Sequence, residues 1–188
     1  MNRRRARRRL LSPLLVFTAC ATAAPTDLDG APANPLQVAP GEAHVLVFTS
    51  HECPIANAYA PTLQALAGHW QTLPVRLFLV HVDPDLSAAA ARRHASDYAL
   101  PGRILLDPGH SLARAVGATR TPEAVVLTPA GLVYRGRIDD QWQALGARAA
   151  AATHHDLGDA VTAALAGRPL AGPFPAAVGC LLPEPRAH

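Results

Sequence analysis

The segment from His44 to Trp70 constrains the fold of this chain more than any other stretch. Its first part, Val45 to Phe48, is an unbroken run of residues that favour strands, and polar residues suited to a turn follow it. After Cys53-Pro54 the apolar residues recur at helical spacing, and proline is well suited to a first helical turn. The pattern therefore predicts a buried strand, a tight turn and a helix, with Cys53 at the junction.

Cys53 is the predicted nucleophile. The unpaired backbone N–H groups and the dipole at a helix N-terminus favour the thiolate, which is the form that attacks disulfides and peroxides. The alternative is an inert buried thiol, since free cysteines are among the most buried residues, but the start of a helix is a poor place for one. His51 would tune the thiol, bind a metal or simply be exposed to solvent, and Glu52 would oppose thiolate formation if it lay close.

The remaining strands and helices alternate along the chain. The first of them favour parallel strands joined by helices, and Pro129 to Gly131 favours a later hairpin. Residues 141–153 form an Ala-rich, irregular insertion. The expected fold class is α/β, with a central mixed β-sheet flanked by helices on both faces. The expected strands after the first are 75–82, 103–107, 123–127 and 132–138, and the expected later helices are 87–98, 110–116 and 157–166.

Five short motifs carry a resemblance to a known family. They are C-P-I-A-N-A-Y-A-P, T-P-E-A-V-V-L, L-V-Y-R-G-R-I-D-D, H-D-L and V-G-C, and they span about residues 38 to 182. Together they resemble exported bacterial redoxins of the AhpC/TSA–thioredoxin-like type with a C-P-x-x-N motif. The resemblance implies a thioredoxin-like fold and redox chemistry at a cysteine. The chain departs from the C-x-x-C motif of thioredoxins, because Ala56 stands at the second cysteine and Asn57 follows it.

Two further expectations concern residues far from Cys53 in sequence. In thioredoxin-like folds a cis-proline lies beside the reactive cysteine, and Thr121-Pro122 holds the matching place before a strand; a trans proline that merely starts the strand is the alternative. Arg135 and Arg137 alternate along one predicted strand. If Arg137 approaches Cys53, it would lower the pKa of the thiol and hold an anionic leaving oxygen, whereas a solvated strand face is the alternative.

Cys180 is the candidate resolving thiol. A motif with one cysteine turns over when a distant thiol closes its sulfenic acid to a disulfide. A permanent structural disulfide of the tail and a bond to another chain are the alternatives, and the sequence does not show whether Cys53 and Cys180 meet. The expected organisation is a signal peptide (1–23), a linker (24–37), a thioredoxin-like redoxin domain (38–168) and a C-terminal tail with Cys180 (169–188).

The basic charge of the chain is concentrated at its start. Six of its 17 basic residues, all of them arginine, precede Leu10, so that 11 basic residues face 14 acidic ones in the rest of the chain. Nucleic-acid binding is therefore not expected. An apolar stretch to Ala19 and small residues up to Ala23 complete a signal-peptide pattern that is short for a membrane span. We expect export to the bacterial periplasm with cleavage after Ala23, in preference to a lipid anchor on Cys20, and the arginine run leaves twin-arginine export open.

These observations predict an exported thiol redox protein that acts on a thiol or disulfide partner protein or on a peroxide substrate. The T-x-x-C motif of peroxidases is matched only if Ser50 replaces threonine, so reductase and peroxidase are not separated. Two alternatives are copper binding, as in Sco-like assembly proteins whose second cysteine is here Asn57, and a non-catalytic thioredoxin-like binding module. No cofactor, metal or stable membrane span after signal cleavage is expected. The predicted catalytic residues are Cys53, Cys180, Pro122 and Arg137.

Overall fold

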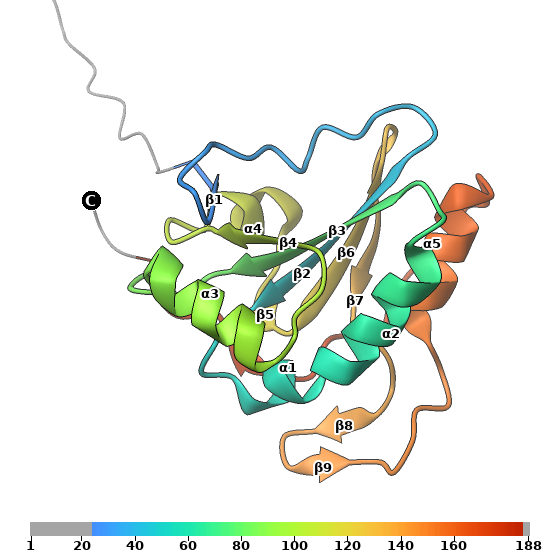
Figure 1. Ribbon diagram of the computed structural model, residues 1–188. Coiled ribbons are helices and arrows are strands. Elements are labelled where there is room, and N and C mark those ends of the chain that lie inside the picture. Colours follow the sequence, from blue (N-terminus) through green and yellow to red (C-terminus); the bar gives the residue numbers. More distant parts are fainter. Residues whose placement is uncertain (1–23, 186–188) are drawn as a thin grey trace, which may run out of the picture.

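A mixed six-stranded sheet forms the centre of the protein (Figure 1). The computed structural model describes residues 24–185, and the expected signal peptide lies outside them. The strand order is β1-β4-β3-β2-β6-β7, in which β3 runs parallel to both β2 and β4 and the other neighbours are antiparallel. These strands are β1 (Thr26–Asp27), β2 (Ala43–Thr49), β3 (Val75–His81), β4 (Arg103–Leu106), β6 (Glu123–Thr128) and β7 (Gly131–Gly136).

Helices cover both faces of the sheet, as the sequence predicts. All of β2 is buried, which explains why its sequence is a continuous apolar run rather than an alternating one. Val45 and Val47 pack into a core with residues of α1, α2 and α5, whereas Leu46 and Phe48 pack on the opposite face with residues of α4. The helices are α1 (Pro54–Ala58), α2 (Ala60–Trp70), α3 (Ala88–Asp97), α4 (Ser111–Val116) and α5 (Asp156–Leu165).

The helical segment after Cys53 is divided in two. α1 ends at Ala58, and α2 begins at Ala60 with Pro61 in its first turn. Proline has no backbone N–H and disfavours helical geometry in the residue before it, so an uninterrupted helix would lose a hydrogen bond at this point. The periodicity of the apolar residues predicts the helical segment but not this break.

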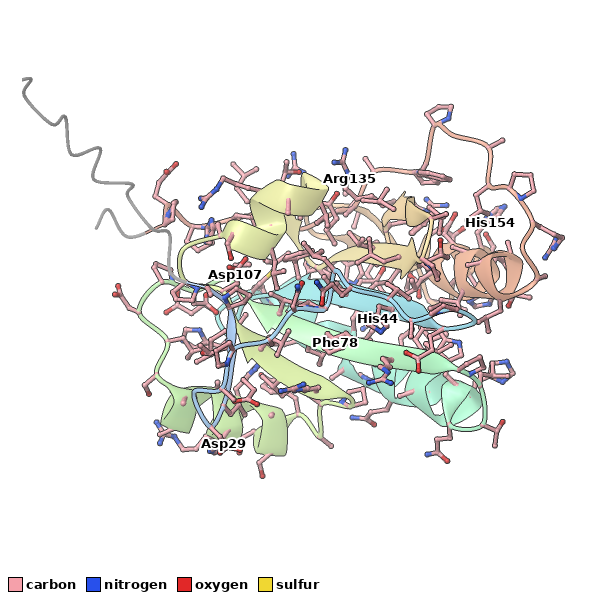
Figure 2. All side chains as sticks on the ribbon, turned by 90° about the horizontal axis from the view of Figure 1, so that it is seen from above. Asp29, His44, Phe78, Asp107, Arg135 and His154 are labelled. Atoms are coloured by element: carbon pink, nitrogen blue, oxygen red, sulfur yellow. The ribbon has the colours of Figure 1, made fainter. Side chains whose placement is uncertain are left out.

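Asp107 and Arg135 hold the two ends of α4 (Figure 2). The buried Asp107 carboxylate accepts hydrogen bonds from the backbone N–H groups of residues 111–113 at the start of the helix. The Arg135 guanidinium donates to the carbonyls of Val116 (3.1 Å) and Gly117 (2.8 Å) at its end. Both contacts satisfy backbone groups that a helix end leaves unpaired. Arg135 therefore stabilises a helix end.

Residues 24–37 are more than a linker. They contribute β1, which pairs with β4 at the edge of the sheet, and Asp27 in β1 binds Arg103 with an Oδ2–Nη2 distance of 2.7 Å. A strand of two residues has no periodicity of its own. Its position depends on pairing with a distant strand, which is why sequence patterns do not indicate it.

The insertion and the tail also contain strands. Within residues 141–153, β8 (Trp142–Ala144) and β9 (Ala147–Arg148) form a separate hairpin that projects beyond α1 and α2 in Figure 1. In the tail, β10 (Cys180–Leu181) pairs with β5 (Arg120–Thr121), so the C-terminal segment returns to the domain. In the part of the chain from residue 24 to 185, no helix has the length and apolar character needed to cross a bilayer.

Core packing yields a first prediction. Leu79 in β3 is 1% exposed, so Leu79→Ala should lower the free energy of unfolding by about 2–5 kcal/mol through lost burial and a residual cavity. Leu132 in β7 is 45% exposed, and Leu132→Ala should change the free energy of unfolding by less than about 0.5 kcal/mol. Chemical denaturation measures both, and equal losses would contradict the described core.

Candidate active site

Cys53 lies at the junction between strand and helix that the sequence predicts. β2 ends at Thr49, and the backbone N–H of Cys53 donates to the carbonyl of Ser50 at 3.2 Å, which closes the turn. Cys53 directly precedes α1, and its carbonyl accepts the N–H of Asn57 at 3.0 Å. Cys53 is only 2% exposed, so its sulfur is shielded from large molecules.

Cys180 reaches Cys53 from the other end of the chain. The register of β10 against β5 places Cys180 opposite Thr121. The two Sγ atoms are 2.8 Å apart, and both cysteines are free thiols. Because the S–S bond of a disulfide is about 2.05 Å long, a movement of about one ångström is enough to form one. The structure thus brings together two residues that the sequence leaves unconnected.

Pro122 lies next to this contact. The peptide bond between Thr121 and Pro122 is cis. The Cys53 thiol donates to the carbonyl of Thr121 at 3.1 Å, and Thr121 is fully buried. Proline has no N–H to donate, so the backbone beside the sulfur presents a carbonyl and no competing donor at this residue.

The contact between the two thiols separates their pKa values. Burial acts to raise the pKa of Cys53, but hydrogen bonds from the Cys180 thiol, from Thr121 and from the backbone N–H groups of Ala56 and Cys180 outweigh burial and lower it below its ordinary value. At Cys180, burial and the hydrogen bond to Cys53 raise the pKa to about 11. Cys53 is therefore the thiol that ionises first, which is the property required of a nucleophile.

Arg137, which was expected to act at the Cys53 sulfur, is paired with a carboxylate in the structure. The Arg137 guanidinium binds Asp156 at the start of α5, with an Nε–Oδ2 distance of 2.7 Å. Within residues 24–185, neither Arg137 nor Arg135 lines the cavity beside Cys53. Arg137 directly follows β7, the outermost strand of the sheet on this side, and a carboxylate is available there. The alternation of Arg135 and Arg137 along a strand predicts that both side chains lie on one face of the sheet. It does not predict which residue each of them binds.

A cavity of about 260 Å³ opens beside Cys53. The Ser50 hydroxyl donates to Asp83 Oδ1 at 2.5 Å and accepts the N–H of Glu52 at 3.3 Å. Since its only proton is directed at Asp83, this hydroxyl can offer a molecule in the cavity an acceptor but no donor. The cavity is lined by Ser50, Glu52, Cys53, Asp83, Thr121, Cys180, Leu181 and Pro183.

Asp83 is a site residue that sequence reasoning missed. Its Oδ2 accepts the backbone N–H of His51 at 3.1 Å, and the Nδ1 atoms of His51 and His81 lie 3.2 and 3.5 Å away. Burial acts to raise the pKa of Asp83, but hydrogen bonds from His81, Ser50 and His51 outweigh it and hold the pKa well below its usual range. The sequence did contain a signal for this residue, because Asp83 is an acid that directly follows a strand expected to be buried and parallel. The carboxyl ends of parallel strands meet at one edge of a sheet, which is where the turn before Cys53 also lies.

Asn57 braces the turn that carries Cys53. Its Nδ2 donates to the carbonyl of His51 at 3.0 Å, so its Oδ1 is the acceptor for His94 Nε2 at 2.8 Å, and this assigns the proton to that ring nitrogen. Burial, together with the nearby His81 and His51, lowers the pKa of His94 to about 4, so the ring is neutral near pH 7. The asparagine of the C-P-x-x-N motif therefore has a structural role.

The histidines near Cys53 do not form a recognisable metal site. The His94 ring lies 5.1 Å from that of His81 and 6.4 Å from that of His51, measured between ring centres. In the described range, 24–185, no group of three or more His, Cys, Asp or Glu side chains is placed to hold a metal ion. The geometry thus gives no support to the copper-binding alternative.

The model of the AhpC/TSA family matches residues 19–137 of the chain. No curated protein sequence matches it.

Solved structures match over most of the chain. An uncharacterised conserved protein from Geobacillus kaustophilus gives a TM-score of 0.72 at 24% identity, covering 87% of this chain and 89% of that one. A hypothetical protein from Sinorhizobium meliloti gives a TM-score of 0.73 at 22% identity, covering 91% of this chain and 95% of that one. A secreted Mycobacterium tuberculosis disulfide oxidoreductase homologous to Escherichia coli DsbE gives a TM-score of 0.54 at 24% identity, covering 76% of this chain and 96% of that one. These likenesses establish the thioredoxin-like fold.

The coupling of the two thiols can be tested by titration. Cys180→Ala removes a hydrogen-bond donor to the Cys53 thiolate, so the pKa of Cys53 should rise. The measurement is the pH dependence of iodoacetamide alkylation at Cys53, followed by peptide mass spectrometry. Cys180→Ser keeps a hydroxyl donor and should restore part of the shift. An unchanged or lower pKa in Cys180→Ala would contradict the coupling.

The charge of Asp83 can be tested through stability. Asp83→Asn should lower the free energy of unfolding at about pH 7 by about 1–3 kcal/mol, since buried donors lose a charged acceptor. The pKa of Asp83 is lower in the folded than in the unfolded state, so its stabilising effect is present above about pH 4 and is lost as the pH falls further. Urea unfolding should therefore show a smaller difference in the free energy of unfolding between Asp83→Asn and the wild type at about pH 3 than at about pH 7.

The matched control for this experiment is Asp29→Asn. The Asp29 side chain is 84% exposed, so its ion pair with Arg92 should contribute little to stability at either pH. An Asp83→Asn difference that stays constant between the two pH values would show that the carboxylate charge is not the stabilising feature.

Proposed function

The chain belongs to the AhpC/TSA family, and from this premise we propose that it is an exported thiol peroxidase that cycles between a dithiol and a Cys53–Cys180 disulfide. The observation that carries the proposal is the 2.8 Å separation of the two Sγ atoms beside a small cavity. Export to the periplasm is proposed on the signal-peptide pattern of residues 1–23. Cleavage after Ala23 is favoured over a lipid anchor on Cys20.

The proposed cycle begins at Cys53. Its thiolate attacks one oxygen of a hydroperoxide, an S–O bond forms as the O–O bond breaks, and the leaving alkoxide or hydroxide takes up a proton. This step converts Cys53 to a sulfenic acid. The Cys180 sulfur then attacks the Cys53 sulfur, the S–O bond breaks, and the hydroxide leaves as water with the Cys180 proton. Two electrons from an external dithiol, small or protein-borne, return the disulfide to two thiols.

The size and the lining of the cavity favour a small oxidant. Sites for drug-sized ligands usually enclose about 300–1,000 Å³, and the cavity beside Cys53 is smaller, at about 260 Å³. Cys53 is 2% exposed, which disfavours direct attack on a disulfide of a folded protein. The Ser50 hydroxyl, three residues before Cys53, is oriented by Asp83 to accept a hydrogen bond. A hydroperoxide O–H is a donor that fits this acceptor, and an organic disulfide has no such group.

Thiol–disulfide exchange is the second candidate function. One observation favours it, namely that an extended strand carrying a cysteine already pairs with Thr121 beside Cys53. In this case Cys53 would attack a disulfide sulfur and form a mixed disulfide, and Cys180 would then release the reduced product. Pro122 would shape the same site in both reactions. Both candidates are consistent with the thioredoxin-like redox chemistry of the family.

Stoichiometric oxidation tests the proposal and separates the two candidates. One equivalent of hydrogen peroxide should remove both thiols of the wild type and lower its intact mass by two hydrogens. Cys180→Ser should instead lose one thiol and form a sulfenic acid at Cys53, which dimedone labels. Cys53→Ser should keep its Cys180 thiol.

The control oxidant is a small disulfide such as oxidised dithiothreitol or glutathione disulfide. Oxidation of the pair by this reagent but not by peroxide would favour the second candidate. Peroxide consumption by Cys53→Ser at the wild-type rate would exclude Cys53 as the nucleophile.

A further inference from the structure

The C-terminal segment lies on the active site as an added strand. In Figure 1 it is red and passes behind α1 and α2 to reach β5. Cys180 lies opposite Thr121, and the N–H of Leu182 donates to the carbonyl of Thr119 at 3.2 Å. β5 is thus a short strand edge that holds an extended peptide by backbone contacts, and such contacts do not depend on most side chains of the peptide.

The residue before the cysteine is sterically restricted. A Cβ atom added at Gly179 would overlap the carbonyl oxygen of Thr121 and would lie 2.7 Å from the Thr121 carbonyl carbon and 3.1 Å from Pro122 Cδ. Thr121 is fully buried, so its backbone cannot retreat from this contact without disturbing the core. A strand therefore places its cysteine against Cys53 in this register only if glycine comes immediately before that cysteine.

The residue after the cysteine is unrestricted by comparison. Leu181 is 69% exposed, so its side chain extends mostly into solvent. The preceding Val178, in contrast, packs against the main hydrophobic core. Of the two residues that flank the cysteine, only the glycine before it is sterically restricted, and Val178 adds a packing contact.

We infer that β5 is a docking edge for cysteine peptides, that it selects extended strands containing a Gly-Cys pair, and that the chain's own residues 179–181 occupy it in the resting protein. The external ligand of this edge is a Gly-Cys segment of a partner protein, as a thiol or a disulfide. The inference rests on the proposed function in that Cys53 must be redox-active. It adds a rule for which protein cysteines gain access to Cys53.

Competition with the tail follows from this arrangement. The tail is tethered, so its effective concentration at β5 is high, and a partner segment reaches β5 only when β10 leaves. Small oxidants need no such displacement, because they enter the cavity that the tail leaves open. The edge therefore admits protein partners rarely and small molecules freely while β10 is in place.

The direct test uses activated peptides and the Cys180→Ser variant of the mature protein, residues 24–188, in which Cys53 is the single cysteine. The probe is a peptide with the tail sequence A-A-V-G-C-L-L-P, whose cysteine is blocked as a mixed disulfide with 2-thiopyridine. Cys53 thiolate attacks the peptide sulfur, a new Cys53–peptide disulfide forms, and pyridine-2-thione leaves and is followed by absorbance. The matched peptide carries alanine in place of the glycine, and we expect it to react at least about tenfold more slowly. A peptide with alanine after the cysteine should react like the first.

A small reagent separates failure of this inference from failure of the proposed function. 2,2′-Dithiodipyridine carries no peptide, so its reaction with Cys53 reports thiol reactivity alone. If Cys53 does not react with it, the proposed function and the docking inference both fail. If Cys53 reacts with it but the glycine and alanine peptides react equally fast, the docking inference alone is overturned.

A variant of the intact chain provides a second measurement. Gly179→Ala should displace β10 from β5, slow the oxidative closure of Cys53 with Cys180 at least about tenfold, and speed the reaction with the glycine peptide. The matched control is Gly68→Ala in α2, where an added Cβ meets no atom within 4 Å, and closure should keep its wild-type rate. Wild-type closure in Gly179→Ala would overturn the steric rule.

Discussion

The position of β2 is the constraint on which the rest of the structure depends. It is hydrogen-bonded to β3 on one side and to β6 on the other, and all seven of its residues are buried. The registers in which β2 pairs with β3 and β6 determine where the residues of the candidate site lie. Phe48 lies opposite Glu123, so Pro122 falls at the end of β2, and Thr49 lies opposite His81, so Asp83 falls beside the turn before Cys53. A one-residue slip in either pairing would move these groups to the wrong face.

Among the described residues, no arginine lines the cavity beside Cys53, although the pKa of this thiol is lowered. Two carboxylates, Glu52 and Asp83, line the cavity beside Cys53 instead. The Asp83 carboxylate accepts hydrogen bonds from the Ser50 hydroxyl and the His51 backbone N–H, and these bonds stabilise its charged form. The second thiol, Thr121 and nearby backbone N–H groups supply the hydrogen bonds that lower the pKa of Cys53. The low pKa of Cys53 is therefore tied to the position of the C-terminal tail.

Sequence patterns predicted the parts of the fold that rest on burial and local conformation. Val45 to Phe48 indicated the central strand, and Cys53-Pro54 indicated the start of the helix, because both signals are local. The contacts that sequence patterns did not indicate are long-range and polar. β1 and β10 are two residues long and acquire their structure only by pairing, and Arg137 binds whichever carboxylate the fold brings near it. Whether Cys53 meets Cys180 depends on a backbone register that no periodicity encodes.

The distance between the two cysteines along the chain has a consequence for biosynthesis. Cys53 and Cys180 are 127 residues apart, whereas the cysteines of a C-x-x-C motif leave the ribosome almost together. Domains form as the chain emerges from its N-terminal end, and contacts across such a separation form slowly. Until β10 reaches β5, Cys53 lacks its partner thiol and the hydrogen bond from Cys180 that lowers its pKa. The order of synthesis thus leaves a period in which no second thiol lies beside Cys53, and during it Cys53 is open to exchange with foreign disulfides. The period ends only when β10 is in place.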